Sequence, residues 1–160
     1  MRRVMLSAML LATPATAADL TVAKAATVVA DGTPSLKPRA LPGATISYSL
    51  TVTNPLGNAA LTIRNLQIDD AVDPAMQLSL ADLGAAGSGP VEFTDGGLLG
   101  LFGSGLTLAG ITYSKDGRDF TYQPKPVGGV DPAVRAIRFR LSGTQNTGGS
   151  FRLRYRAIVR

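Results

Sequence analysis

The sequence predicts an all-β fold, an antiparallel β-sandwich of about seven to nine strands formed by residues 18–160 as a single domain. Three observations lead to this prediction. Apolar and polar residues alternate in period two along several stretches, as they do in strands that bury one face. Turn residues separate these stretches every eight to fifteen residues. No stretch has a sustained helical period, which argues against alternating strands and helices.

The first 17 residues have the pattern of a secretory leader. Met1–Arg3 is positively charged, Val4–Ala12 is apolar, and Ala15–Ala17 has the small residues of a cleavage site. An uncleaved membrane anchor would need roughly 20 apolar residues, and this run has nine. We therefore expect a mature chain that begins at Ala18 and is exported. The leader does not distinguish the periplasm from the cell surface or the exterior.

The composition excludes several kinds of site. The sequence has no Cys, no His and no Trp. Disulfides, Cys- or His-ligated metals and the Ser-His-Asp and Cys-His nucleophile systems are thereby excluded. We expect no cofactor, no metal and no catalytic activity.

The charge of the chain is unevenly distributed. Without Arg2 and Arg3 of the leader, 14 basic and 11 acidic residues remain, a net charge of +3. Residues 18–100 hold four basic and eight acidic residues, whereas residues 101–160 hold ten basic and three acidic ones. The high isoelectric point is therefore a property of the C-terminal part.

The clearest strand lies within Pro42–Asn58, between a Pro-Gly turn and an Asn-Pro turn. Small polar residues alternate there with five apolar ones: Ala44, Ile46, Tyr48, Leu50 and Val52. Before it, Asp19–Asp31 is expected to form a first strand with a break near Ala25 and Ala26. The connection between the two strands, 32–42, is rich in proline and is expected to be extended.

Further strands are expected after this one. Residues 60–70 change the parity of their apolar positions, which predicts a bulge near Arg64 and Asn65. Asp69–Pro74 is expected to form a turn. Short strands are expected at 76–80 and 91–93.

The segment 97–110 is rich in both glycine and leucine, and two interpretations are open. It either folds over one end of the sandwich or forms an exposed interaction loop, and burial of Leu99, Leu101, Phe102 and Leu106 is the favoured one. Residues 106–115 are expected to be extended. Asp116-Gly117, between apolar residues 111–113 and 120–122, predicts a hairpin turn.

Arginines alternate with large apolar residues along the last two expected strands, 137–141 and 151–156. A hairpin with Leu141 opposite Phe151 would place all of these arginines on one exposed face. The candidate anion-binding face consists of Arg138, Arg140, Arg152, Arg154 and Arg156.

Arginine offers paired donors to phosphate and carboxylate, so this face would suit a surface lipid or an acidic polysaccharide. The alternative is a solvated face whose charges prevent pairing with other chains. Nucleic acid is not expected, because the chain is exported and no aromatic residues lie among these arginines.

Four motifs resemble the conserved-repeat domains of bacterial cell-surface proteins, a class of unknown function with an immunoglobulin-like β-sandwich. They are LTVAKAATVV, PGATISYSLTVTN, IDDAVDP and, more loosely, FRLRYRAIVR. The likeness is best over residues 19–76, and this chain has one copy where the class usually has tandem arrays. The resemblance implies a structural or adhesive role at the bacterial envelope, with envelope proteins, glycans or lipid head groups as partners.

Two further sites are not favoured. Some bacterial surface sandwiches cross-link a lysine to an asparagine, and Lys24 would be the amine, but 151–160 contains neither Asn nor Asp. Calcium could gather Asp69, Asp70 and Asp73, yet their spacing lacks the pattern of an EF-hand loop and suits a turn. We therefore expect no cross-link and no calcium site.

Overall fold

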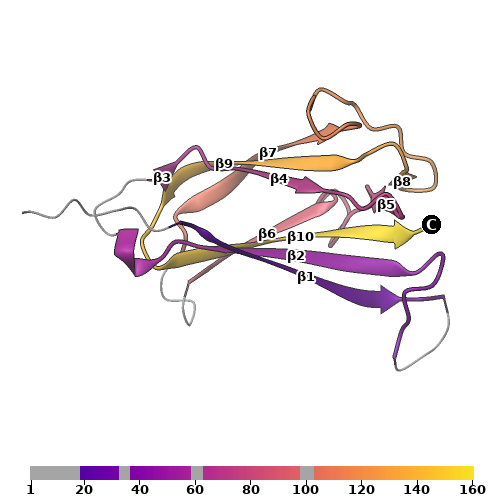
Figure 1. Cartoon of the computed structure of the whole chain (residues 1–160), viewed down its shortest axis with the longest axis horizontal. Coiled ribbons are helices and arrows are strands. Elements are labelled where there is room, and N and C mark those ends of the chain that lie inside the picture. The colour runs from indigo at the N-terminus through magenta and orange to yellow at the C-terminus, as the bar shows by residue number, and fades with distance from the viewer. Residues whose placement is uncertain (1–18, 33–36, 59–62, 98–102) are drawn as a thin grey trace, which may run out of the picture.

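The computed structural model describes residues 19–32, 37–58, 63–97 and 103–160. Two antiparallel sheets form two layers, which confirms the predicted β-sandwich (Figure 1). The described residues contain no α-helix, and no helix among them has the length and hydropathy needed to span a membrane.

The first sheet has six strands, and β10 is its most connected member. β10 pairs with β2 on one side and with both β5 and β6 on the other. Beyond β2 the sheet ends at β1, and beyond β5 it ends at β8. The strands are β1 (Thr21–Ala30), β2 (Thr45–Thr53), β5 (Met76–Ser79), β6 (Val91–Gly97), β8 (Val130–Asp131) and β10 (Gly149–Val159).

The second sheet has four strands and is built around β9. β7 lies on one side of β9, and β3 and β4 follow each other on the other side. The strands are β3 (Ile63–Arg64), β4 (Gln67–Ala71), β7 (Leu106–Ser114) and β9 (Ala136–Gln145). One short 3₁₀ turn, η1 (Leu56–Asn58), precedes this sheet in the chain.

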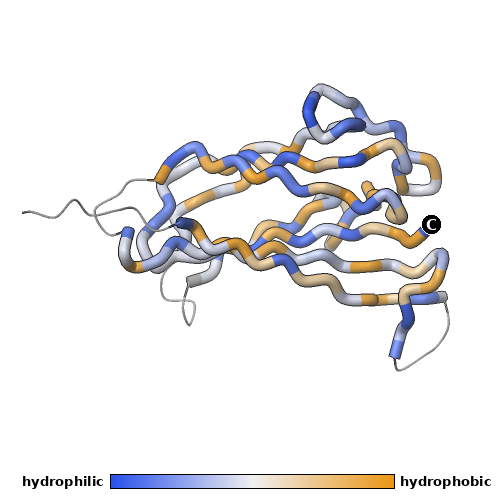
Figure 2. The backbone as a smooth tube through the Cα atoms, viewed as in Figure 1, coloured by the Kyte–Doolittle hydropathy of each residue, from blue (hydrophilic) through white to orange (hydrophobic). Residues whose placement is uncertain are grey.

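β2 follows the predicted alternation. Ile46, Leu50 and Val52 are at most 4% exposed, whereas the serines and threonines between them are only partly buried. Gly43 has a φ of 85° in the turn before β2, a backbone conformation that glycine adopts without steric cost. A similar alternation is visible in Figure 2, where blue and orange segments succeed each other along the strands of the upper layer.

Aromatic rings connect the two sheets in the core. Tyr155 of β10 stacks on Tyr48 of β2 at 5.2 Å between ring centroids and faces Phe139 of β9 at 6.3 Å. Phe151 lies 5.7 Å from Phe93 of β6. Such ring pairs contribute about 0.5–1.5 kcal/mol each beyond the area that they bury.

The predicted hairpin between the last two strands is wrong. β9 pairs with β7, β3 and β4, while β10 pairs with β2, β5 and β6, so the two strands lie in different sheets. Their apolar residues meet face to face across the core, as Phe139 and Tyr155 do. The chain crosses between the layers at Asn146–Gly148, where Gly148 has a φ of 71°.

Two other local predictions have different outcomes. The strand predicted over residues 60–70 is divided into β3 and β4, and in place of the predicted bulge near Arg64 and Asn65 the chain leaves the strand at Asn65, which has a φ of 52°. The break in the first strand is misplaced: the irregularity lies between Val28 and Ala30 instead of at Ala25 and Ala26.

The hairpin predicted at Asp116-Gly117 forms only in part. The turn is present, but its second arm contributes a single bridge, Tyr113 to Tyr122, in place of a strand. Leu106, in the Gly/Leu segment, is 2% exposed, as the burial interpretation predicts. Leu99, Leu101 and Phe102 lie outside the described residues.

Candidate binding face

The outer face of the first sheet carries a row of three arginines on β10. Phe151, Leu153 and Tyr155 are at most 1% exposed and point into the core. The residues between them must therefore point outward, because successive side chains of a strand alternate. The row consists of Arg152, Arg154 and Arg156.

Hydroxyl groups flank this arginine row on both sides. On β2, Thr51, Ser49 and Ser47 are the register partners of the three arginines in turn. On β6, Thr94 is opposite Arg152 and Glu92 is opposite Arg154. The arrangement combines charged donors with neutral donors on a solvent-facing surface.

Arg152 borders a shallow hollow of about 250 Å³ that Thr51, Thr94 and Ser150 help to line. The Ser150 hydroxyl donates to the Gly96 carbonyl, so it is already used. The guanidinium of Arg152 and the two threonine hydroxyls have no hydrogen bond to other described residues. These groups can donate to an oxyanion placed in the hollow.

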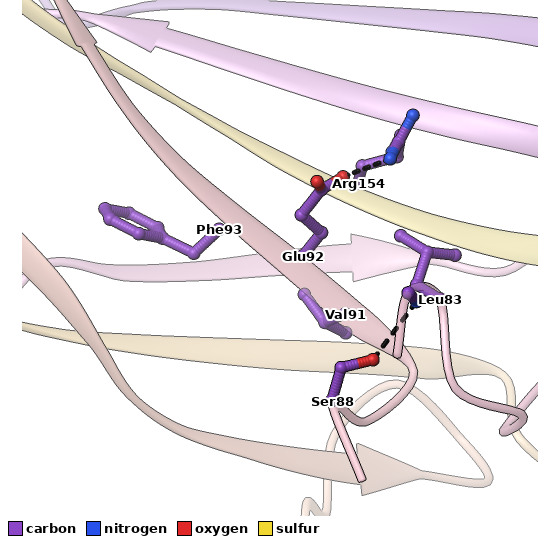
Figure 3. Close-up of a pocket in the computed structure, with 7 residues that line it drawn as sticks. Leu83, Ser88, Val91, Glu92, Phe93 and Arg154 are labelled. Carbon is purple, nitrogen blue, oxygen red and sulfur yellow. Dashed lines mark hydrogen bonds and ion pairs between the residues drawn. The ribbon is translucent and has the colours of Figure 1, made fainter. Parts of the chain in front are cut away.

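Arg154 forms an ion pair with Glu92 beside a second hollow of about 300 Å³ (Figure 3). Leu83 and Ser88, from the loop between β5 and β6, lie at the same hollow. The Nε of Arg154 is buried and has no hydrogen-bond partner among the described residues. The row thus has three guanidinium groups and one neighbouring carboxylate, so its net charge is positive.

The other two predicted arginines lie in the second sheet, so the five residues do not form one face. Arg138 donates two hydrogen bonds to Asp69, both of 2.7 Å, and its guanidinium lies 3.8 Å from the Phe120 ring centroid. These hydrogen bonds lower the pKa of Asp69 and raise that of Arg138. Arg140 is exposed and lies opposite Gln67 and Gly110.

Lys24 and Asp70 form an interaction that sequence reasoning missed. The Lys24 ammonium lies 2.6 Å from Asp70 Oδ1 and 4.9 Å from the centroid of the Tyr48 ring. The other Asp70 oxygen accepts a 2.7 Å hydrogen bond from the buried Tyr155 hydroxyl. Burial, with the Asp70 carboxylate next, raises the pKa of Tyr155, so this hydroxyl stays a donor.

We still expect no covalent cross-link at Lys24. Its side chain is 38% exposed, its ammonium forms an ion pair with Asp70, and residues 151–160 contain neither Asn nor Asp as a partner. The predicted result is an intact mass of the mature chain equal to its sequence mass. Loss of one ammonia or one water would contradict this prediction.

The three aspartates considered for calcium have separate partners. Asp69 faces Arg138, Asp70 faces Lys24, and Asp73 accepts a hydrogen bond from the Ala75 amide. Within the described ranges, no group of three or more acidic side chains is placed to hold a metal ion.

Two further aspartates, Asp95 in β6 and Asp116 in the loop after β7, also serve local structure. Asp116 accepts hydrogen bonds from the amides of Arg118 and Asp119, which lower its pKa to about 2. Asp95 accepts one from the Ser104 amide. Carboxylates held in this way stabilise turns.

Asp131 is a buried carboxylate that holds the loop before β8. It is 2% exposed and accepts hydrogen bonds from the Tyr122 hydroxyl and from the amides of Lys125 and Ala133, at 2.7–2.9 Å. Burial alone would raise the pKa of Asp131. These hydrogen bonds outweigh burial and hold the pKa below its usual 3.8.

The lowered pKa of Asp131 predicts that this residue makes an acid-sensitive contribution to stability. Because the folded pKa is the lower one, the contribution is complete above about pH 4 and is lost as the pH falls through the folded pKa. Asp131→Ala should lower the free energy of unfolding at pH 7 by about 2 kcal/mol. The difference from the parent, measured by urea unfolding, should shrink at pH 3, and a constant difference would contradict the assignment.

The chain matches no known family model, and a comparison with curated proteins finds no match. The resemblance to the conserved-repeat domains therefore stays a prediction.

Proposed function

We propose that this protein is a secreted, non-catalytic β-sandwich with a structural or adhesive role at the bacterial envelope. The observation that supports it is that the acidic side chains described above serve local structure. Asp95 and Asp116 accept hydrogen bonds from backbone amides and Asp69 and Asp70 pair with cations, while the outer face of the first sheet remains available for contact. The leader-like residues 1–17 support export.

Expression of the full chain with its own leader tests this role. The processed protein should begin at Ala18 and should be recovered with the envelope or outside the cell. Deleting the gene should reduce adhesion of the cells or the integrity of the envelope, and the intact gene should restore it. Recovery of unprocessed protein from the cytoplasm would contradict the proposal.

A second candidate function is the binding of an anionic group on the arginine row of β10. It is favoured by the position of Arg152 and Arg156, which form no ion pair with any described residue and lie beside the hydroxyls of β2. A phosphate or carboxylate can take paired hydrogen bonds from guanidinium and further ones from threonine or serine. Surface lipids and acidic polysaccharides carry these groups.

Removing the two unpaired arginines tests this candidate. The variant Arg152→Ser/Arg156→Ser should elute from heparin at a clearly lower salt concentration than the parent, because two charged contacts are lost. Sedimentation with vesicles that contain a phosphate-bearing lipid distinguishes a lipid head group from a glycan. Loss on heparin alone favours a glycan, and loss on both supports shared anion chemistry.

The matched control is Arg64→Ser/Arg140→Ser, which removes the same charge from exposed positions of the second sheet. It should leave retention close to that of the parent. An equal loss in both variants would mean that net charge alone causes retention, and the candidate site would be rejected.

A further inference from the structure

β1 is a long strand with one free edge. It pairs with β2 along Thr21–Ala30 and forms the end of the first sheet, so its other edge has no strand partner among the described residues. Residues 21–27 are all exposed. Backbone donors and acceptors along such an edge are available to another strand.

The side chains of β1 do not protect this edge. Val22 is 55% exposed and Val29 is 47% exposed, and the remaining neighbours are alanine, threonine and valine. Proteins commonly guard an edge with lysine or proline. The single charge here, Lys24, is turned inward to Asp70 of the second sheet and therefore leaves the edge open.

The core side of β1 is also uncovered. Val22, Lys24, Ala26 and Val28 are paired with residues of β2 that face the core, yet the first three are exposed and Val28 is only partly buried. The second sheet thus does not extend over β1, as Figure 1 shows for the lower edge of the sandwich. A neighbour added at this edge would cover apolar surface as well as backbone groups.

We propose that β1 pairs with β1 of a second copy of this chain, antiparallel and about a two-fold axis at Ala25. A two-fold axis perpendicular to the sheet pairs even-numbered residues with even-numbered ones and odd-numbered residues with odd-numbered ones. The residue at the axis therefore faces the same residue of the other copy. With Ala25 at the axis, Val22 faces Val28 twice, Ala23 faces Thr27, and Lys24 faces Ala26. This contact is isologous and closes as a dimer.

The charge of Lys24 and the irregular end of β1 favour an axis at Ala25 over an axis at either neighbouring residue. An axis at Lys24 would set two lysines directly opposite each other, which is unfavourable. An axis at Ala26 would pair Val22 with Ala30 and extend the ladder into the irregularity between Val28 and Ala30. The axis at Ala25 avoids both, and each Lys24 is already compensated by Asp70 of its own chain.

The dimer joins the first sheets of two copies into one continuous sheet. The arginine rows of both copies then lie on the same face, because this two-fold axis preserves the faces of the sheet. The inference deepens the proposed structural role and rests on it for its biological meaning. Dimer formation is measured on purified protein, whereas envelope association is measured on cells, so either can fail alone.

The test introduces a charge at the axis, on protein recovered after export with its own leader. Ala25 is exposed, so lysine or glutamate at this position should leave the fold intact, as circular dichroism and the melting temperature will verify. Sedimentation equilibrium should show a dimer for the parent. Both Ala25→Lys and Ala25→Glu should raise its dissociation constant about fivefold, because like charges meet at the axis.

Mixing the two variants should restore the dimer, since the introduced lysine of one copy then meets the introduced glutamate of the other. The matched control is Ala23→Lys, because residue 23 faces Thr27 of the other copy, and this variant should retain the parent's affinity. Ala23 and Ala25 are comparable positions, since each lies in a cross-strand row with one arginine of β10. A parent that is monomeric at every concentration would overturn the proposal. A dimer that Ala25→Lys does not weaken would also overturn it, because the contact would then lie elsewhere.

Discussion

Replacing Tyr155 by alanine should lower the free energy of unfolding by about 4 kcal/mol. Tyr155 is 1% exposed and is among the largest fully buried side chains. Its ring contacts Tyr48 in its own sheet and Phe139 in the opposite sheet, so the truncation leaves a cavity between the layers. Urea unfolding followed by far-ultraviolet circular dichroism measures the change.

Tyr155→Phe is the control that separates the ring from the hydroxyl. It keeps both ring contacts and removes the hydrogen bond to Asp70, so the expected loss is about 1–2 kcal/mol. If the two variants lost the same free energy of unfolding, packing of the ring would not be the larger contribution of Tyr155. A loss below about 1 kcal/mol for alanine would contradict the described core.

Replacing Asn54 by alanine should lower the free energy of unfolding by about 3 kcal/mol. The Asn54 side chain is 0% exposed, donates to the carbonyls of Gln145 and Asn146, and accepts a 2.8 Å hydrogen bond from Asn58. It ties the end of β2 to the segment where the chain crosses between the sheets. Alanine would remove all three of these hydrogen bonds.

The control for Asn54 is Gln123→Ala, an exposed polar residue in the loop after β7. It should change stability by less than about 0.5 kcal/mol. If Asn54→Ala were equally mild, the buried hydrogen-bond network at this end of the sandwich would be incorrect.

Period-two alternation identified β2 and much of the fold correctly, because half-buried strands impose it locally. The alternation of β9 and β10 was equally clear, yet their predicted pairing was wrong. Alternation reports that a strand has one buried face and one wet face. It carries no information on whether the next strand lies beside it or across the core.

The same limit explains why only three of the five predicted arginines share one face. Sequence alone identified Arg152, Arg154 and Arg156 as outward-facing, and this is confirmed by the burial of the residues between them. The separation of Arg138 and Arg140 from them depends on which sheet each strand joins. Asp69, five strands earlier in the chain, gave no local sign that it would neutralise Arg138.

The sequence did not reveal the roles of two buried polar residues, for a related reason. Asn54 and Asp70 lie in segments rich in turn residues, and such residues are usually exposed. Their roles depend on partners 85–92 positions away, namely Tyr155 for Asp70 and Asn146 for Asn54. A polar residue at the end of a strand can therefore be a structural anchor, and only long-range contacts reveal it.

The most direct test of the arginine row is a titration of the isotope-labelled protein with a heparin-derived oligosaccharide, followed by amide chemical shifts. If the row binds the anion, the largest changes should cluster at Arg152, Arg156 and the neighbouring Thr51 and Thr94. The amides of Arg138 and Arg140, in the other sheet, should change little. Changes of equal size on both sheets, or changes confined to the second sheet, would contradict the proposed binding face.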